Sequence, residues 1–136
     1  MAERSERVER ALENHRKGYN CAQAVACAYA DLFGVDEKTA FRMTEGFGFG
    51  MGTMGTCGAV SGMAACAGMK NSDGDLAEPG TKKGSYKLIK AMTNAFLEKN
   101  GSIICRDIKG VDTGKVLRSC DGCIEDAAQI IEETLL

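Results

Sequence analysis

The stretch from Gly46 to Gly62, GFGFGMGTMGTCGAVSG, constrains the fold of this chain more than any other, because seven of its seventeen residues are glycine. Glycine loses more conformational entropy on folding than other residues and has no side chain to pack. A run this rich in glycine therefore indicates unusual backbone angles or a close approach to the backbone. Cys57 lies within it, directly before Gly58. We expect the approaching group to be whatever Cys57 binds or reacts with.

Length and charge limit the classes of protein to consider. The 136 residues suit one domain with a buried core, so we expect a single four-cysteine helical domain over residues 1–136. The net charge of -2 favours neither nucleic acid nor an anionic membrane as a binding partner. No apolar run is long enough to span a bilayer, and the charged N-terminal stretch contains no secretory signal. We therefore expect a cytoplasmic protein without membrane insertion.

The cysteine content is unusually high, with seven cysteines against a single histidine, His15. A reducing compartment disfavours stable structural disulfides, so metal binding or redox chemistry becomes the leading interpretation. Any metal site must then consist mainly of thiolates. We expect His15, which lies on or beside the apolar stripe of the first helix, to be a half-buried surface histidine rather than a ligand.

Apolar periodicity and capping residues predict an all-α protein. Asn20 and Gln23 form a capping-box pattern, Asp36 is a candidate N-cap, and Ser102 precedes a short helical turn. We expect a compact bundle of about six helices with a glycine-rich loop between the third and the fourth. Its faces rich in alanine and glycine suit association with a second copy, so we expect a homodimer. The predicted helices cover residues 5–17, 20–33, 36–45, 56–67, 81–100 and 124–135.

Four cysteines fall at or near predicted helix starts, namely Cys21, Cys57, Cys105 and Cys120. The positive end of a helix dipole lowers the pKa of a thiol and stabilises negative charge. Four such thiols, far apart in sequence, would suit one site at the end of a helical bundle. Helical spacing turns the two remaining mid-helix cysteines away from this site, and we expect both to be small core residues: Cys27 and Cys66.

Two short motifs have alternative interpretations. Gly50, Gly52 and Gly55 spell GxGxxG, but a dinucleotide site needs a preceding strand, and the pattern predicts a helix there. Cys120 and Cys123 form a CxxC. A c-type haem site needs histidine at the next position, and a thioredoxin-like dithiol needs a βαβ unit. The remaining interpretation is that this motif supplies two ligands, or half, of a metal site.

Segments around the four helix-start cysteines carry a resemblance to a known family. The chain resembles the C_GCAxxG_C_C family of redox-active proteins, whose pattern is C…CGAxxG…C…C. The family's four characteristic cysteines correspond to Cys21, Cys57, Cys105 and Cys120. Cys123 falls where members often carry an aliphatic residue, so the CxxC is either incidental or this protein's own addition. The matching segments are residues 19–25, the glycine stretch through Gly62, residues 102–107, and Cys120 with residues 124–128.

The resemblance implies a redox function. Some members are exported with a twin-arginine signal, which suggests a folded cofactor, and a related domain in a cytochrome carries a [2Fe–2S] cluster. We therefore expect an iron–sulfur cluster, with [2Fe–2S] as first choice, bound by the four family cysteines for electron transfer to an unknown redox partner protein. Gly58 would contribute a backbone N–H near the cluster sulfurs.

Two alternatives use the same cysteines: a metal-free thiol–disulfide oxidoreductase, and a zinc-binding structural or sensory protein. No catalytic acid/base pair or Ser/His arrangement is visible, so the sequence names no catalytic residue and leaves enzymatic activity open.

Overall fold

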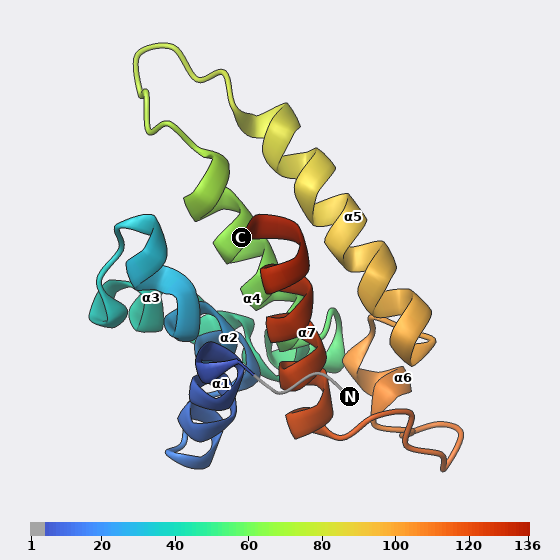
Figure 1. The fold of residues 1–136 in the computed structure, drawn as a ribbon. Helices are drawn as coiled ribbons and strands as arrows, with labels where there is room; N and C mark the ends of the chain where they lie inside the picture. The colour runs from blue at the N-terminus through green and yellow to red at the C-terminus, as the bar shows by residue number, and fades with distance from the viewer. Residues whose placement is uncertain (1–4) are drawn as a thin grey trace.

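A computed structural model describes residues 5–136, which contain seven α-helices and no strand (Figure 1). The predicted all-α class is confirmed, and the short turn after Ser102 is one of the seven helices. Residues 1–4, the first part of the charged N-terminal stretch, lie outside the described residues. The helices are α1 (Glu6–Arg16), α2 (Cys21–Tyr29), α3 (Glu37–Thr44), α4 (Gly58–Asn71), α5 (Lys82–Asn100), α6 (Cys105–Ile108) and α7 (Cys120–Leu135).

The centre of the bundle is the contact between α2 and α4. Every residue of α2 after Cys21 is buried, and four of these eight residues are alanine. A side chain at Gly62 on α4 would place its Cβ 2.9 Å from the Cβ of Val25 and 3.0 Å from the carbonyl oxygen of Ala22. Gly62 therefore allows the two helix backbones to approach more closely than a larger residue would.

The other long helices surround this pair. Helix α1 packs on α2 and α7, whereas α5 packs on α4 and α7 at the opposite side of the bundle (Figure 1). Helix α7 lies between them and buries Ile124, Ala127 and Ile131 completely. Cys27 and Cys66 are both in the core, as predicted.

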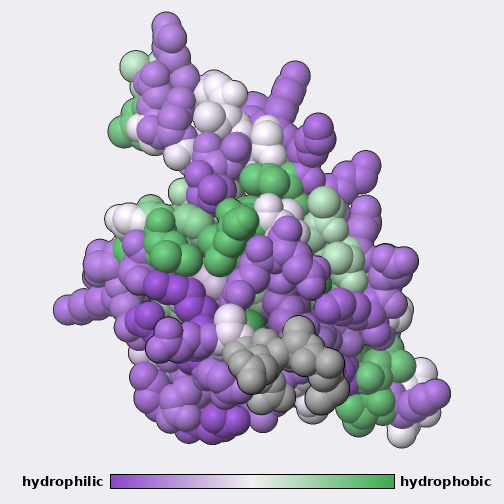
Figure 2. Space-filling view, viewed as in Figure 1, coloured by the Kyte–Doolittle hydropathy of each residue, from purple (hydrophilic) through white to green (hydrophobic). Residues whose placement is uncertain are grey.

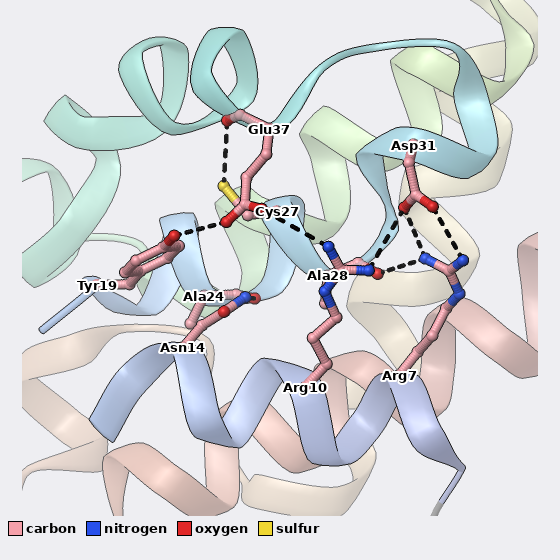
Figure 3. Close-up of polar contacts among 9 residues, drawn as sticks. All are labelled: Arg7, Arg10, Asn14, Tyr19, Ala24, Cys27, Ala28, Asp31 and Glu37. Atoms are coloured by element: carbon pink, nitrogen blue, oxygen red, sulfur yellow. Dashed lines mark hydrogen bonds and ion pairs between the residues drawn. The ribbon is translucent and has the colours of Figure 1, made fainter. Parts of the chain in front are cut away.

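Polar contacts fix α1 and α3 on either side of α2 (Figure 3). Arg7 donates to the Asp31 carboxylate at 2.6 Å, and Arg10 forms an ion pair with Glu37 at 3.6 Å. The hydroxyl of Tyr19 also donates to Glu37, at 2.5 Å. The Tyr19 contact holds the chain segment between α1 and α2 against α3. That segment leads directly into Cys21.

Local capping signals explain most helix boundaries. Asn20 and Gln23 form the predicted capping box, and the Asp36 side chain accepts from the backbone N–H of Thr39. Two predicted starts are wrong. Helix α4 begins at Gly58 with Cys57 as its N-cap, rather than with Thr56 as the cap. Helix α7 begins at Cys120 rather than Ile124.

The early start of α7 has a clear cause in Ser119. Its hydroxyl accepts a hydrogen bond from the backbone N–H of Gly122 at 3.0 Å, which satisfies one of the free donors of the first turn. The Cys120–Cys123 motif is therefore inside the helix rather than before it.

The 3₁₀ and π turns around α3 and α4 belong to the connections. Residues Ala30–Phe33 continue α2 as a 3₁₀ turn, residues Glu45–Phe47 form a second one, and residues Gly50–Met54 form a π turn. The last two lie in the predicted glycine-rich loop, which is thus compactly folded.

The face seen in Figure 2 is hydrophilic over most of its area, with separate hydrophobic patches. Large exposed apolar residues include Met43, Leu76 and Leu136. Within residues 5–136, no helix has the length and apolar character needed to cross a bilayer.

The close contact of α2 and α4 predicts different outcomes for two glycines of α4. Gly62→Ala would push Val25 and the α2 backbone away and should destabilise the protein by about 1–3 kcal/mol. Gly68→Ala, which meets no atom within 4 Å, should stabilise it by roughly 0.5–1 kcal/mol. Chemical denaturation measures both. Equal stability of the two variants would contradict the packing described for Gly62.

Candidate functional site

One end of the bundle contains a pocket of about 220 Å³ lined by five of the seven cysteines. Cys21, Cys105 and Cys120 are the first residues of α2, α6 and α7, and Cys57 is the N-cap of α4. The four cysteines singled out from their helix-start positions thus line the same pocket. The fifth is Cys123, whose role the sequence left open. The other residues that line the pocket are His15, Asn20, Phe49, Gly50, Gly58, Ile108, Lys109 and Arg118.

A short backbone pairing brings Cys57 beside Cys105. Thr56 and Ile104 form an isolated antiparallel bridge, referred to below as the Thr56–Ile104 bridge. The N–H of Cys57 donates to the carbonyl of Ile103 at 2.7 Å, and the N–H of Cys105 donates to the carbonyl of Gly55 at 2.6 Å. Two cysteines that are distant in sequence are therefore held in fixed register.

Two glycines are needed for the walls of the pocket. Gly50 has a left-handed backbone with φ of 58°, and a Cβ there would lie 2.4 Å from the nitrogen of Gly55. A Cβ at Gly58 would lie 3.1 Å from the Cβ of Cys21 and 3.3 Å from the carbonyl oxygen of Phe47. The glycine stretch thus allows close approach of backbone to backbone and of backbone to cysteine.

The loop beside the pocket is strained at three non-glycine residues. Phe49, Met51 and Met54 have φ values of 53°, 61° and 59°, in the left-handed region that such residues rarely adopt. Phe49 and Met51 are also more than half exposed, at 55% and 54%. Their side chains therefore lie largely outside the core. Phe49 instead lines the pocket, with the Lys109 ammonium 5.7 Å from the centre of its ring.

Basic side chains stand around the thiols. The Lys109 ammonium donates to the sulfur of Cys120 at 3.7 Å. Nδ1 of His15 is 2.7 Å from a carboxylate oxygen of Asp121, and Arg118 forms an ion pair with Asp126 at 3.1 Å. The Lys109 ammonium therefore favours the thiolate form of Cys120.

Four of the pocket thiols form two contacting pairs. The thiol of Cys21 donates a hydrogen bond to the sulfur of Cys120, which lowers the pKa of Cys120 together with the charges of Lys109 and His15. The thiol of Cys123 donates to the sulfur of Cys57, which lowers the pKa of Cys57 together with the backbone N–H groups of Ala59 and Val60.

The donor thiol of each pair has a raised pKa, and so does Cys105, which belongs to neither pair. Donation to the partner sulfur is the main reason that the pKa values of Cys21 and Cys123 are raised, with burial adding to the effect. The pKa of Cys105 is raised by burial. Each pair can therefore hold one thiolate and one thiol, which is the protonation state that thiol–disulfide chemistry requires.

Several lining residues were not predicted from the sequence, and Cys123 and His15 show why. Cys123 is three residues after Cys120 on α7, so both lie on one helix face, but this relation holds only because α7 begins at Cys120. His15 reaches the pocket because α1 packs against α7, and no local signal in the sequence indicates that contact. His15 is partly exposed, as expected, yet it belongs to the site.

The thiols are distributed along the pocket walls. Among residues 5–136, no three His, Cys, Asp or Glu side chains surround one point as the ligands of a single metal ion would. The arrangement consists of two pairs and the neighbouring Cys105.

Fold and site together define an all-helical protein with a cysteine-lined pocket. The family model described as "Putative redox-active protein (C_GCAxxG_C_C)" matches residues 19–134, and the chain belongs to this family. The resemblance seen in the sequence is thereby confirmed, and with it the assignment to a redox-active class. No curated protein and no solved structure matches the chain.

The surroundings of Cys120 predict unusual reactivity at low pH in the reduced, metal-free protein. Because its pKa is lowered to about 5, Cys120 remains a thiolate at pH 6 and its alkylation rate should change less than about two-fold between pH 8 and pH 6. An ordinary cysteine slows roughly 80-fold over this range. Mass spectrometry of iodoacetamide-treated peptides measures the rate.

A charge variant tests the cause of this reactivity. Lys109→Met should slow alkylation of Cys120 at pH 6, whereas Lys90→Met on α5 should not. A Cys120 that slows with falling pH like an ordinary thiol would refute the electrostatic argument.

Proposed function

We propose that the pocket binds an iron–sulfur cluster, with [2Fe–2S] as first choice, and that the protein serves in electron transfer. The thiolates of Cys21, Cys57, Cys105 and Cys120 would be the ligands. The observation that carries this proposal is the convergence of four thiols from four separate segments on one pocket. Iron–sulfur clusters are held by four cysteine thiolates of this kind. When bound, such a cluster takes up and releases single electrons.

The distribution of the thiols fits two irons. In a [2Fe–2S] centre each iron takes two protein ligands. Cys21 and Cys120 are in contact and would serve one iron. Cys57 and Cys105 are held side by side by the Thr56–Ile104 bridge and would serve the other.

The charges around the pocket fit an anionic group. Thiolates and cluster sulfides carry negative charge that the protein must offset. Helices α2, α4 and α7 begin at the pocket, and the backbone N–H groups of Ala59 and Val60 contribute to the lowered pKa of Cys57. Lys109 adds a cation beside Cys120. Such donors raise the reduction potential of a bound cluster.

A second candidate is metal-free thiol–disulfide exchange at Cys21 and Cys120. The contact between these two thiols and the lowered pKa of Cys120 favour it. Both side chains are partly exposed, so an external disulfide could reach them. This candidate needs no metal and predicts a reversible disulfide in the purified protein.

The expected partners also remain proposals. Exposed Phe49 and Met51 beside the pocket would provide apolar contact for a redox partner protein. The small-residue face of α4 packs against α2 within the protomer, so the expected homodimer needs another surface. Light scattering would measure the oligomeric state. A cytoplasmic location stays a prediction.

Anaerobic purification followed by iron, sulfide and zinc assays tests the cluster proposal. The wild-type protein should be brown, with stoichiometric iron and sulfide. Serine at any of the four proposed ligand positions should remove most of both. Cys27→Ala and Cys66→Ala change cysteines that do not line the pocket, and these variants should retain the cluster.

The alternatives have separate signatures in the same samples. Folded, colourless protein with stoichiometric zinc would establish the zinc alternative. Folded, metal-free protein that forms a Cys21–Cys120 disulfide would favour the exchange reaction over the cluster.

Gly58 gives a second, more local test. Gly58→Ala would press on Cys21, because the new Cβ would lie 3.1 Å from the Cβ of that residue. We expect lower cluster occupancy or a shifted midpoint potential in this variant. Gly68→Ala on the same helix is the matched control and should resemble the wild type. Unchanged occupancy and potential in Gly58→Ala would argue against a role of Gly58 at the cluster.

A further inference from the structure

Cys123 is the pocket cysteine that the four proposed ligands leave without a role. It is 2% exposed and faces the pocket from the first turn of α7. Cys57, at the start of α4, is 6% exposed, lines the same pocket and belongs to the same buried core cluster as Cys123. Helices α4 and α7 pack against each other, so both cysteines lie where the starts of these two helices meet at the pocket.

The first turn of α7 is shaped to keep Cys123 in this position. A Cβ at Gly122 would lie 2.3 Å from Nε of Arg118. Because Gly122 has no side chain, Arg118 lies across this turn and pairs with Asp126 one turn further along α7. Arg118 and Cys123 both line the pocket, so this contact fixes the turn that carries Cys123 at the pocket wall.

We propose that Cys57 and Cys123 are a dithiol that closes reversibly to a disulfide, which makes Cys123 a functional residue of the pocket. The couple is separate from Cys21 and Cys120 and is more deeply buried. It does not depend on a bound cluster.

A low-molecular-weight disulfide is a sufficient oxidant for this couple. The thiolate of Cys57 attacks one sulfur of that disulfide, whose S–S bond breaks and releases one thiolate. Cys123 then loses its proton to solvent and attacks the Cys57 sulfur, which releases the second thiolate. Two protein thiols are oxidised by two electrons in total, and the external disulfide is reduced to two thiols.

The couple has a consequence for the site that rests on the proposed function. Cys57 is one of the proposed cluster ligands, and a sulfur in a disulfide cannot serve as a thiolate ligand. Closure with Cys123 would therefore exclude a cluster, and a cluster would protect Cys57 from closure. The state of this one cysteine would couple cofactor loading to the redox state of the surroundings.

Peptide mapping of the full chain tests the couple directly. Reduced, metal-free protein is treated with glutathione disulfide, blocked with iodoacetamide and cut before aspartate residues. Cleavage before Asp121 separates Cys120, in peptide 112–120, from Cys123, in peptide 121–125. We expect peptide 121–125 to be joined to peptide 36–72, which contains Cys57 and Cys66. Dithiothreitol should release the link.

Matched variants identify which sulfur of peptide 36–72 is bonded to Cys123. Cys66→Ala should keep the link and Cys57→Ala should lose it, with circular dichroism confirming that both are folded. In the wild type, tandem mass spectrometry of the linked peptides distinguishes Cys57 from Cys66 without any substitution. A free Cys123 after complete oxidation of Cys21 and Cys120 would overturn the proposal, as would a link from Cys57 to Cys105.

A parallel sample separates this inference from the cluster proposal. In protein loaded with iron and sulfide, the link to peptide 121–125 should form only as iron is lost. Formation of the link at full iron occupancy would overturn the proposed exclusion. A protein that never takes up iron but forms the link would refute the cluster proposal and retain the dithiol couple.

Discussion

The close packing of α2 on α4 is the contact on which the pocket depends. Gly62 brings the two backbones together in the core, and Gly58, one turn earlier, brings α4 against Cys21 at the end of the bundle. Because both glycines lie on one face of α4, core packing and site geometry are set by the same surface. A larger residue at either position would change the distance between Cys21 and Cys57, whatever the thiols bind.

Four of the pocket cysteines fall into two pairs that differ in exposure and in the charges near them. The pair Cys21 and Cys120 is partly exposed, and Cys120 lies beside Lys109, whereas Cys57 and Cys123 are both buried. The Cys123 thiol and then backbone N–H groups, rather than charged side chains, stabilise negative charge on Cys57. A protein dipole can do this in a buried place where an unpaired ammonium group would be costly.

Much of this arrangement could be predicted from local sequence. Asn20, Asp36 and Ser5 cap the helices that follow them, since the signal for a cap is contained in three or four residues. The positions of four cysteines at helix starts predicted a shared pocket. Cys123 was missed because the extra turn of α7 depends on Ser119 and on the absence of a side chain at Gly122, beneath Arg118. His15 could not be assigned, since its place depends on packing between the first and last helices.

The Thr56–Ile104 bridge lies at one end of the pair formed by α4 and α5, and the opposite end of this pair is distal to it. Helices α4 and α5 both return to the bridge, while the exposed loop that joins them, residues 72–81, extends from the opposite end of the pair (Figure 1). Changes of length at this distal loop leave both anchor points in place. The loop is therefore a suitable insertion point for a fluorophore or an affinity tag, which could report on the protein without touching its cysteines.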